Sequence, residues 1–279
     1  MPSDDGRNIL ELGAELPVTD ALAKARALYY ARRKKVPIPP FTDAEPALDM
    51  ADGYAIQQEL VSLLLADGDR VIGHKVGLTS KPMQELIGVD SPDYGPVLAS
   101  VLYLDGDTIP PAEFIAPRIE AEIVFVLGER LEGPGVTVTA ARAAIAGAVA
   151  GVEIIDSRIV DWRIRLADTV ADLASQGAVA VSSRVVPLDE FDARFLGVTL
   201  TRNGEVVDTG AGAAALGDPV AVLAWLANVL GEDGVSLEPG QLIMTGALHA
   251  AVPMNEGDVF RAEFDRLGPV TVRVGRTSA

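Results

Sequence analysis

The chain has 279 residues, with 40 acidic and 23 basic side chains and a formal net charge of −17. Such a charge repels phosphate backbones and anionic membrane surfaces, so neither nucleic acid nor a membrane is expected as a partner. There is no cysteine and there are only two histidines, which excludes disulfides, thiolate metal sites and a histidine-rich zinc site. Oxygen ligands remain, and they suit Mg²⁺, Mn²⁺ or Ca²⁺.

The first third of the chain predicts helices. Thr19 or Asp20 can cap a helix through ALAKARALYYARRKK, which ends at a proline cluster, and a second helix runs through YAIQQELVSLLLADG to Gly68. The acidic N-terminus lacks the basic and apolar segments of a signal peptide, and no window reaches about 18 uninterrupted apolar residues. A cytoplasmic location is therefore expected.

After Gly68 the sequence changes to short β-rich runs separated by Gly, Pro and Asp-Gly turns. Strands are expected at 70–77, 97–103, 119–127, 150–156, 178–182, 196–202, 205–208, 240–246, 258–265 and 269–274, and helices at 81–87, 139–149, 159–174 and 218–230. Asn203-Gly204 predicts a two-residue hairpin turn. The pattern indicates an α+β fold, with a helical N-terminal segment at 1–69 and a β-rich catalytic body at 70–279.

Three acids stand in apolar surroundings. Glu120 and Glu122 lie two residues apart in RIEAEIVFVL, so a strand would place them on one face, about 6.6–7 Å apart along the chain. They could simply be solvated where the strand begins. Glu153 in AGVEIID has no such explanation, because a buried carboxylate must be protonated, paired or bound to a metal. The alternatives are a shared cation and a salt bridge from Glu153 to Arg118 or Arg158.

Other polar residues allow two interpretations each. Lys75, between Gly73 and Gly77 in an apolar strand, is either a lysine that extends to the surface or an anion anchor and proton donor in a pocket. Asp93 is expected in a turn-rich loop and Ser175 at a helix end. His74 should face the opposite side of the strand from Lys75, and His249 lies in a loop with no obvious partner. There is no G-x-S-x-G elbow and no phosphate-binding loop.

Five segments together resemble the 2-keto-4-pentenoate hydratase and 4-oxalocrotonate decarboxylase family of the fumarylacetoacetate hydrolase superfamily. They are GHKVGLTS, SPDYGPVL, PRIEAEIVFVL, GVEIIDSRI and LGDPVAVLAWLANVL, and the resemblance runs from about residue 20 to 274. It implies a mixed β-roll of the superfamily's C-terminal-domain type behind a helical N-terminal segment. It also implies a homo-oligomer, and association with another enzyme of the same pathway is a further expectation.

The resemblance also implies the site. Glu120, Glu122 and Glu153 match the ligands of Mg²⁺ or Mn²⁺, and the catalytic positions match Lys75, Asp93 and Ser175. Leu173 stands where the family pattern has Asn. A 2-oxo acid can chelate a hard cation, and the cation stabilises an enolate at the 2-oxygen.

The expected activity is a hydro-lyase reaction on a small 2-hydroxy-2,4-dienoate in aromatic or steroid ring catabolism, giving a 4-hydroxy-2-oxo acid. The first alternative is a 4-oxalocrotonate-type decarboxylase, which would need a further cation for the distal carboxylate of its substrate. Hydrolytic carbon–carbon cleavage usually wants a His–Glu-like base arrangement that the sequence does not offer. A further alternative is that the protein is not an enzyme but a catalytically silent partner subunit that binds a structural ion.

Overall fold

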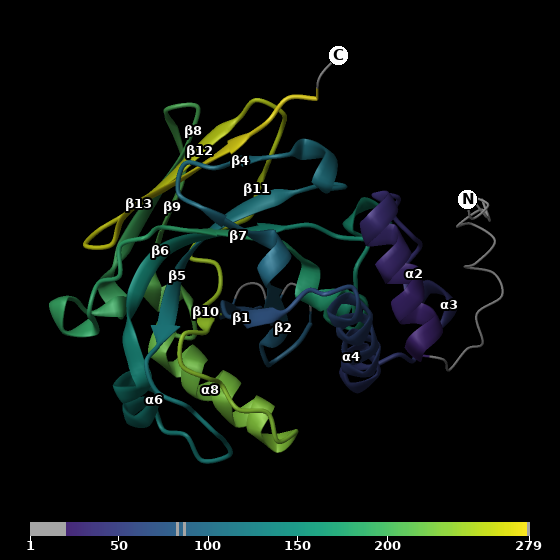
Figure 1. Ribbon diagram of the computed structural model, residues 1–279, viewed down its shortest axis with the longest axis horizontal. Helices are drawn as coiled ribbons and strands as arrows, with labels where there is room; N and C mark the ends of the chain where they lie inside the picture. The colour runs from purple at the N-terminus through teal and green to yellow at the C-terminus, as the bar shows by residue number, and fades with distance from the viewer. Residues whose placement is uncertain (1–20, 82–83, 86–87, 278–279) are drawn as a thin grey trace.

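The computed structural model describes residues 21–81, 84–85 and 88–277. The predicted caps Thr19 and Asp20, and positions 82–83 and 86–87 of the predicted helix at 81–87, lie outside the described residues. Figure 1 shows the N-terminal helices gathered on one side of the molecule and the sheets on the other. The predicted α+β fold with a helical N-terminal segment is confirmed, while the division at residue 69 stays a prediction.

The N-terminal segment contains α2 (Ala21–Lys34), α3 (Phe41–Ala44) and α4 (Met50–Ala66). Helix α4 begins four residues before the predicted start because Asp49 caps it: its carboxylate accepts from the Asp52 amide at 3.0 Å, and the Asp52 carboxylate accepts from the Asp49 amide. Leu28 of α2 and Leu60 of α4 belong to one buried apolar cluster, which also includes residues from the β-rich body. The helices therefore stay together by apolar burial.

The β-rich body consists of two sheets. The eight-stranded sheet has the order β2-β1-β10-β5-β6-β7-β3, with β11 also paired to β5, and the five-stranded sheet has the order β4-β13-β12-β8-β9. The strands are β1 (Val71–Gly77), β2 (Asp93–Leu98), β3 (Leu102–Leu104), β4 (Thr108–Ile109), β5 (Arg118–Leu127), β6 (Ile145–Ile155), β7 (Gln176–Val181), β8 (Gly197–Arg202), β9 (Glu205–Ala211), β10 (Leu242–Met244), β11 (Val252–Pro253), β12 (Val259–Phe264) and β13 (Gly268–Val274). As predicted, Asn203 and Gly204 join β8 to β9 with positive φ angles of 56° and 88°.

The remaining helices are short apart from α8. They are α6 (Val138–Ala144), α7 (Leu166–Ala171) and α8 (Pro219–Glu232), and 3₁₀ turns occur at Ala99–Val101, Pro111–Glu113, Val160–Trp162, Leu173–Ser175, Leu188–Glu190, Ala193–Phe195 and Gly212–Ala214. By length and composition the stretch Gly212–Glu232 could cross a membrane, but half of its most apolar window is buried inside the protein, as in a core helix. The cytoplasmic location stays a prediction.

Several predicted elements were wrong in their bounds, and in three of them part of the segment has another structure. The strand expected at 97–103 is two strands, β2 and β3, separated by a 3₁₀ turn, and Asp93 opens β2 instead of lying in a loop. The helix expected at 139–149 ends at Ala144, because strand β6 takes the following residues into the sheet centre. The helix expected at 159–174 is reduced to α7 between two irregular turns.

Candidate metal centre

The three glutamates converge on one face of the large sheet. Glu120 lies directly opposite Glu153 in the β5–β6 ladder, and Glu122 lies opposite Gly151. One carboxylate oxygen from each glutamate can be chosen so that all three lie within 4.8 Å of one another. Glu122 and Glu153 are each only 1% exposed, and Glu120 is half-buried. The interpretation of Glu122 as a solvated residue at a strand entrance is therefore wrong.

Burial and mutual repulsion disfavour the charged forms of these acids. Burial, reinforced by Glu153, raises the pKa of Glu120 to about 8. The same two causes raise the pKa of Glu122 well above its usual value. Burial also raises the pKa of Glu153, although the Lys75 ammonium opposes this shift. A divalent cation held by the three carboxylates would remove both the repulsion and the desolvation cost.

The surroundings of one carboxylate oxygen, Glu153 Oε1, indicate whether a cation fits the cluster. Glu153 Oε1 is buried and has no hydrogen-bond partner among the described residues, whereas Oε2 lies 3.4 Å from Lys75 Nζ. Buried carboxylate oxygens normally find a partner, so this one is free to be a ligand. The alternative of a salt bridge from Glu153 to Arg118 or Arg158 is wrong: Arg158 pairs with Asp172 at 2.5 Å, and Lys75 is the cation beside Glu153.

The loop between β10 and β11 supports the two glutamates of β5. Both strands pair with β5, and between them the loop at 245–251 leaves the regular ladder, although the Leu248 amide still donates to the Ala121 oxygen at 3.1 Å. The Gly246 amide donates to Glu122 Oε2 at 2.8 Å. The amide of Ala121, which lies between the two glutamates, donates to His249 Nε2 at 3.0 Å, and His249 Nδ1 lies 2.7 Å from the Ala250 oxygen. The His249 ring thus accepts the hydrogen bond from the Ala121 amide that the backbone of a paired strand would otherwise accept.

Lys75 is a buried cation beside the carboxylates. It is 4% exposed, and its Nζ donates to the Ala174 oxygen at 2.8 Å. Burial alone would lower the pKa of Lys75, but the surrounding acids, led by Glu153 and Asp93, raise it above the usual value. Lys75 therefore stays protonated at neutral pH, and the interpretation as a lysine that extends to the surface is wrong.

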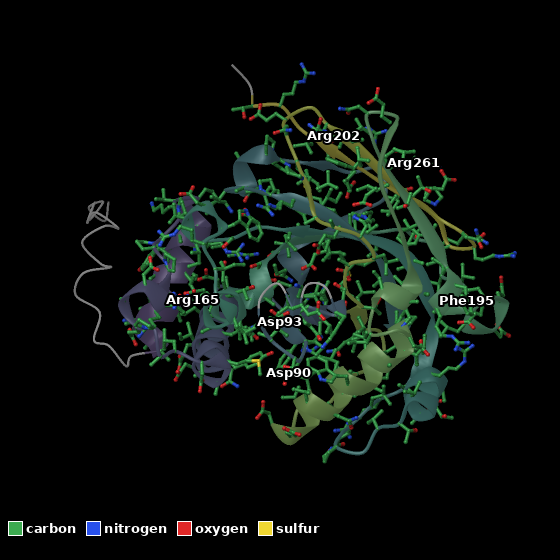
Figure 2. All side chains as sticks on the ribbon, turned by 180° about the vertical axis from the view of Figure 1, so that it is seen from behind. Asp90, Asp93, Arg165, Phe195, Arg202 and Arg261 are labelled. Carbon is green, nitrogen blue, oxygen red and sulfur yellow. The ribbon has the colours of Figure 1, made fainter. Side chains whose placement is uncertain are left out.

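Asp93 lies beside Lys75 because glycine occupies the facing position. It pairs with Gly77 across β1 and β2, and a Cβ atom at Gly77 would lie 2.2 Å from Asp93 Oδ1 and 3.2 Å from Lys75 Nζ. Asp93 Oδ1 is buried without a hydrogen-bond partner in the described part of the chain. Burial raises the pKa of Asp93, and Lys75 opposes the shift. Figure 2 places Asp93 near the centre, between the N-terminal helices and α8.

Ser175 lies in a turn of unusual backbone conformation. Leu173, Ala174 and Ser175 have φ angles of 57°, 52° and 58°, in the left-handed region that residues other than glycine seldom occupy. The turn directs the Ala174 oxygen toward Lys75, whereas the Ser175 hydroxyl lies 2.9 Å from that of Thr169. Leu173, at the position where the family pattern has Asn, is fully buried in the apolar cluster of the N-terminal helices.

Packing from two sides holds this left-handed turn. A Cβ atom at Gly95 would lie 2.5 Å from the Leu173 oxygen, so β2 can approach only because residue 95 is glycine. On the other side, buried Arg158 donates through Nε to Asp172 Oδ1 and through Nη2 to the Asp172 oxygen at 2.9 Å. Asp172, which directly precedes the turn, is thereby held in place.

Two other polar features are separate from this centre. His74 faces away from Lys75, as predicted, with an unpartnered Nδ1 among the described residues, and burial lowers its pKa to about 4. A surface cavity of about 980 Å³ is lined by residues that include Arg32, Asp67 and Arg158, but by none of the six predicted site residues. The size of this cavity does not by itself make it a catalytic site. We therefore place the candidate site at the convergent carboxylates.

Comparison with known proteins identifies the class that this fold and site define. Residues 73–275 match the family model described as fumarylacetoacetate (FAA) hydrolase C-terminal. The chain therefore belongs to the fumarylacetoacetate hydrolase family.

Within that family the chain is similar to curated hydratases. It is 40% identical over 246 residues to the 2-keto-4-pentenoate hydratase of Paraburkholderia xenovorans (strain LB400), covering 88% of this chain and 91% of the relative. It is 36% identical to the 2-oxo-hept-4-ene-1,7-dioate hydratase of Escherichia coli, covering 89% and 96%. A solved structure of 4-oxalocrotonate decarboxylase from Pseudomonas putida G7, complexed with magnesium and adipate, matches with a TM-score of 0.89 at 37% identity, covering 93% and 98%.

Proposed function

We propose that this protein is a hydro-lyase that uses Mg²⁺ or Mn²⁺ to add water to a 2-hydroxy-2,4-dienoate and forms a 4-hydroxy-2-oxo acid. The observation that carries the proposal is the convergence of Glu120, Glu122 and Glu153 within 4.8 Å beside the buried Lys75. Three carboxylates and an unpartnered buried oxygen are suited to a hard divalent cation. When bound, such a cation supplies Lewis-acid stabilisation of negative charge on the 2-oxygen of the substrate.

The residues of the chain supply binding and proton transfer. The substrate must lose the proton of its 2-hydroxyl group and gain one at C5 to become a 2-oxo-3-enoate, and water must then add its hydroxyl group at C4 and a proton at C3. Lys75 is the proton donor in this scheme, because the neighbouring acids keep it charged. Asp93, next to Lys75 across Gly77, orients water and accepts a proton. Ser175 binds the substrate once its hydroxyl turns from Thr169.

Two other functions are weighed against the hydratase, and one of them has specific support. The decarboxylase alternative is supported by the similarity to 4-oxalocrotonate decarboxylase at 37% identity. We favour the hydratase because several curated relatives at about 40% identity over most of the chain have that name. A silent partner subunit would need only the metal ligands, so the buried Lys75 and Asp93 argue against that alternative.

The deciding experiment separates these functions by their products. The purified protein is incubated with Mg²⁺ and, in separate reactions, with 2-hydroxypenta-2,4-dienoate and 2-oxohex-3-enedioate, while dienoate absorbance and CO₂ release are followed. Loss of dienoate absorbance without CO₂ release supports the hydratase. Release of CO₂ from the diacid would replace it with the decarboxylase, and no turnover of either substrate would favour the silent subunit.

A variant pair tests the metal ligands. Glu122→Gln should abolish turnover that depends on Mg²⁺, whereas Glu129→Gln, an exposed acid beyond the end of the same strand, should leave it unchanged. Unchanged activity of Glu122→Gln would refute the assignment. We further propose a cytoplasmic location, as expected from the sequence, and a homo-oligomer, as the family resemblance implies; light scattering tests the subunit number.

A further inference from the structure

Arg118 lies at the open side of the carboxylate cluster. It precedes Glu120 by two residues in β5, so both side chains point to the same face of the sheet. Glu120 is half-buried while Glu122 and Glu153 are buried, and the cluster therefore opens to solvent on the side where Arg118 lies. The family match and the proposed metal ligands give Arg118 no role.

An aromatic ring fixes the orientation of this arginine. The guanidinium carbon of Arg118 lies 4.7 Å from the centroid of the Trp162 ring. Trp162 Nε1 donates to the Ala116 oxygen at 3.0 Å, which ties the indole to the residues just before β5. Stacking covers a face of the guanidinium group and leaves its N–H donors, which lie in the plane, at the edge.

The loop that carries Trp162 has a strained backbone. Asp161 and Trp162 both have a φ angle of 55°, in the left-handed region, although neither is glycine. Such conformations cost free energy and persist where the surrounding structure enforces them, often at binding sites. This conformation occurs at the residue whose indole packs against Arg118.

Arg118 is also a cation whose N–H donors are available to a ligand. It forms no ion pair with any carboxylate in the described part of the chain. Lys75, the other cation beside the cluster, already donates to the Ala174 oxygen and lies 3.4 Å from Glu153. Arg118 does lower the pKa of Glu120, yet screening of a carboxylate requires no stacked and fixed guanidinium group.

We propose that Arg118, held by Trp162, binds a carboxylate group of the substrate and thereby selects the acids that the enzyme accepts. The inference rests on the proposed function, since it assigns a substrate contact to the same site. A guanidinium edge recognises a carboxylate with two parallel hydrogen bonds, which fixes both position and direction. The carboxylate is either the one next to the 2-oxo group or a second one at the far end of a diacid.

Ligand binding tests the proposal without turnover. Binding of adipate and of hexanoate, which have six carbons and differ in one carboxylate, is measured by calorimetry with saturating Mg²⁺. Hydrogen bonds to charged groups contribute about 1.5–3 kcal/mol, so Arg118→Gln should weaken binding roughly 10- to 100-fold. If Arg118→Gln weakens the binding of both acids, Arg118 binds the carboxylate that the two acids share. If it weakens the binding of adipate alone, Arg118 binds the second, distal carboxylate. Unchanged binding of both acids overturns the proposal.

Matched variants separate binding from folding. Arg163→Gln is the control, because Arg163 is exposed, pairs with Asp43 at 2.6 Å and follows Trp162 in sequence; it should bind as the wild type does. Arg118→Lys keeps the charge but loses the paired donors, so it should bind more weakly than the wild type, and wild-type binding would contradict the paired contact. Trp162→Leu should weaken binding in the same direction, and no effect would refute the role of the indole.

Turnover gives the second readout. With whichever substrate the protein converts, Arg118→Gln should raise KM about 10- to 100-fold and change kcat much less, since the contact is present in both ground and transition states. If the protein converts no substrate, the proposed function fails, but the calorimetric result still decides the role of Arg118. A loss of kcat at unchanged KM would count against the proposal that Arg118 binds a carboxylate of the substrate.

Discussion

The ammonium group of Lys75 donates to the Ala174 oxygen at 2.8 Å and lies 3.4 Å from Glu153. Three separate segments meet at this point, and in the proposed function Lys75 is the proton donor. Lys75→Met should reduce turnover by about 10²–10⁴-fold, the usual contribution of a general acid or base. The protein should still fold and bind Mg²⁺, because the three glutamates remain.

A second lysine provides the control for this substitution. Lys35 is half-buried and pairs with Glu113 at 3.2 Å, away from the site, so Lys35→Met should keep wild-type kcat. Steady-state kinetics and calorimetric Mg²⁺ binding measure both effects. If Lys75→Met retained more than about a tenth of wild-type kcat, Lys75 would not be the proton donor assumed here.

Local sequence patterns could predict the part of the site that lies on one strand. Strand alternation placed Glu120 and Glu122 on one face, and the apolar neighbours of Glu153 indicated that it was buried. Strand register could not be predicted, because alternation does not state which residue of β6 lies opposite Glu120. The role of the 245–251 loop was missed for the same reason, since His249 supports an amide 128 residues away.

The fold could be predicted at the level of element types but not of irregular backbone. The left-handed turn at Leu173–Ser175 contains no glycine, so its sequence favours the helix that was predicted there. Tertiary contacts override this preference: Asp172 is fixed by Arg158, and Gly95 admits the Leu173 oxygen. The family resemblance identified Ser175 but carried no information on the conformation that directs Ala174 toward Lys75.

The ion pair between Arg158 and Asp172 should be essential to this turn. Both side chains are buried, at 2% and 1% exposure, so among the described residues Asp172→Asn leaves the Arg158 guanidinium group with only Asp156, at 4.0 Å, as a carboxylate partner. Breaking a buried pair in this way typically costs about 3–5 kcal/mol, measured by denaturant unfolding. Asp43→Asn, which breaks the exposed pair with Arg163, should change the unfolding free energy little. Equal effects of the two substitutions would contradict the structural role of Asp172.

His249 should support metal binding without contacting the metal. His249→Leu removes the acceptor for the Ala121 amide, and residues that orient metal ligands typically contribute about 10–100-fold to metal affinity. His249→Gln carries an acceptor oxygen and should retain more of the affinity for Mg²⁺ or Mn²⁺, as measured by calorimetry. Equal and large losses in both variants would indicate that the imidazole acts in another way, and no loss in either would remove His249 from the site.

Removal of the metal should make stability depend on pH in a definite direction. The pKa of Glu120 is raised to about 8, above its ordinary value of 4.5, so the folded protein without metal binds more protons than the unfolded chain between these values. Stability from this group is fully present below pH 4.5 and is lost as the pH rises through about 8. In EDTA, the melting temperature should fall from pH 6.5 to 8.5.

Excess Mg²⁺ should reduce this fall, because the cation binds the ionised carboxylates and stabilises the folded state by mass action. The pH window avoids His74, whose depressed pKa of about 4 lowers stability only below its ordinary value of 6.5. Lys75 stays charged throughout the window, since its pKa is raised. In EDTA, Glu120→Gln should make the profile less steep without abolishing its slope, because an amide at this position does not titrate while Glu122, whose pKa is also raised, still does. A melting temperature at pH 8.5 that is the same with EDTA and with Mg²⁺ would exclude the glutamate cluster as a metal site.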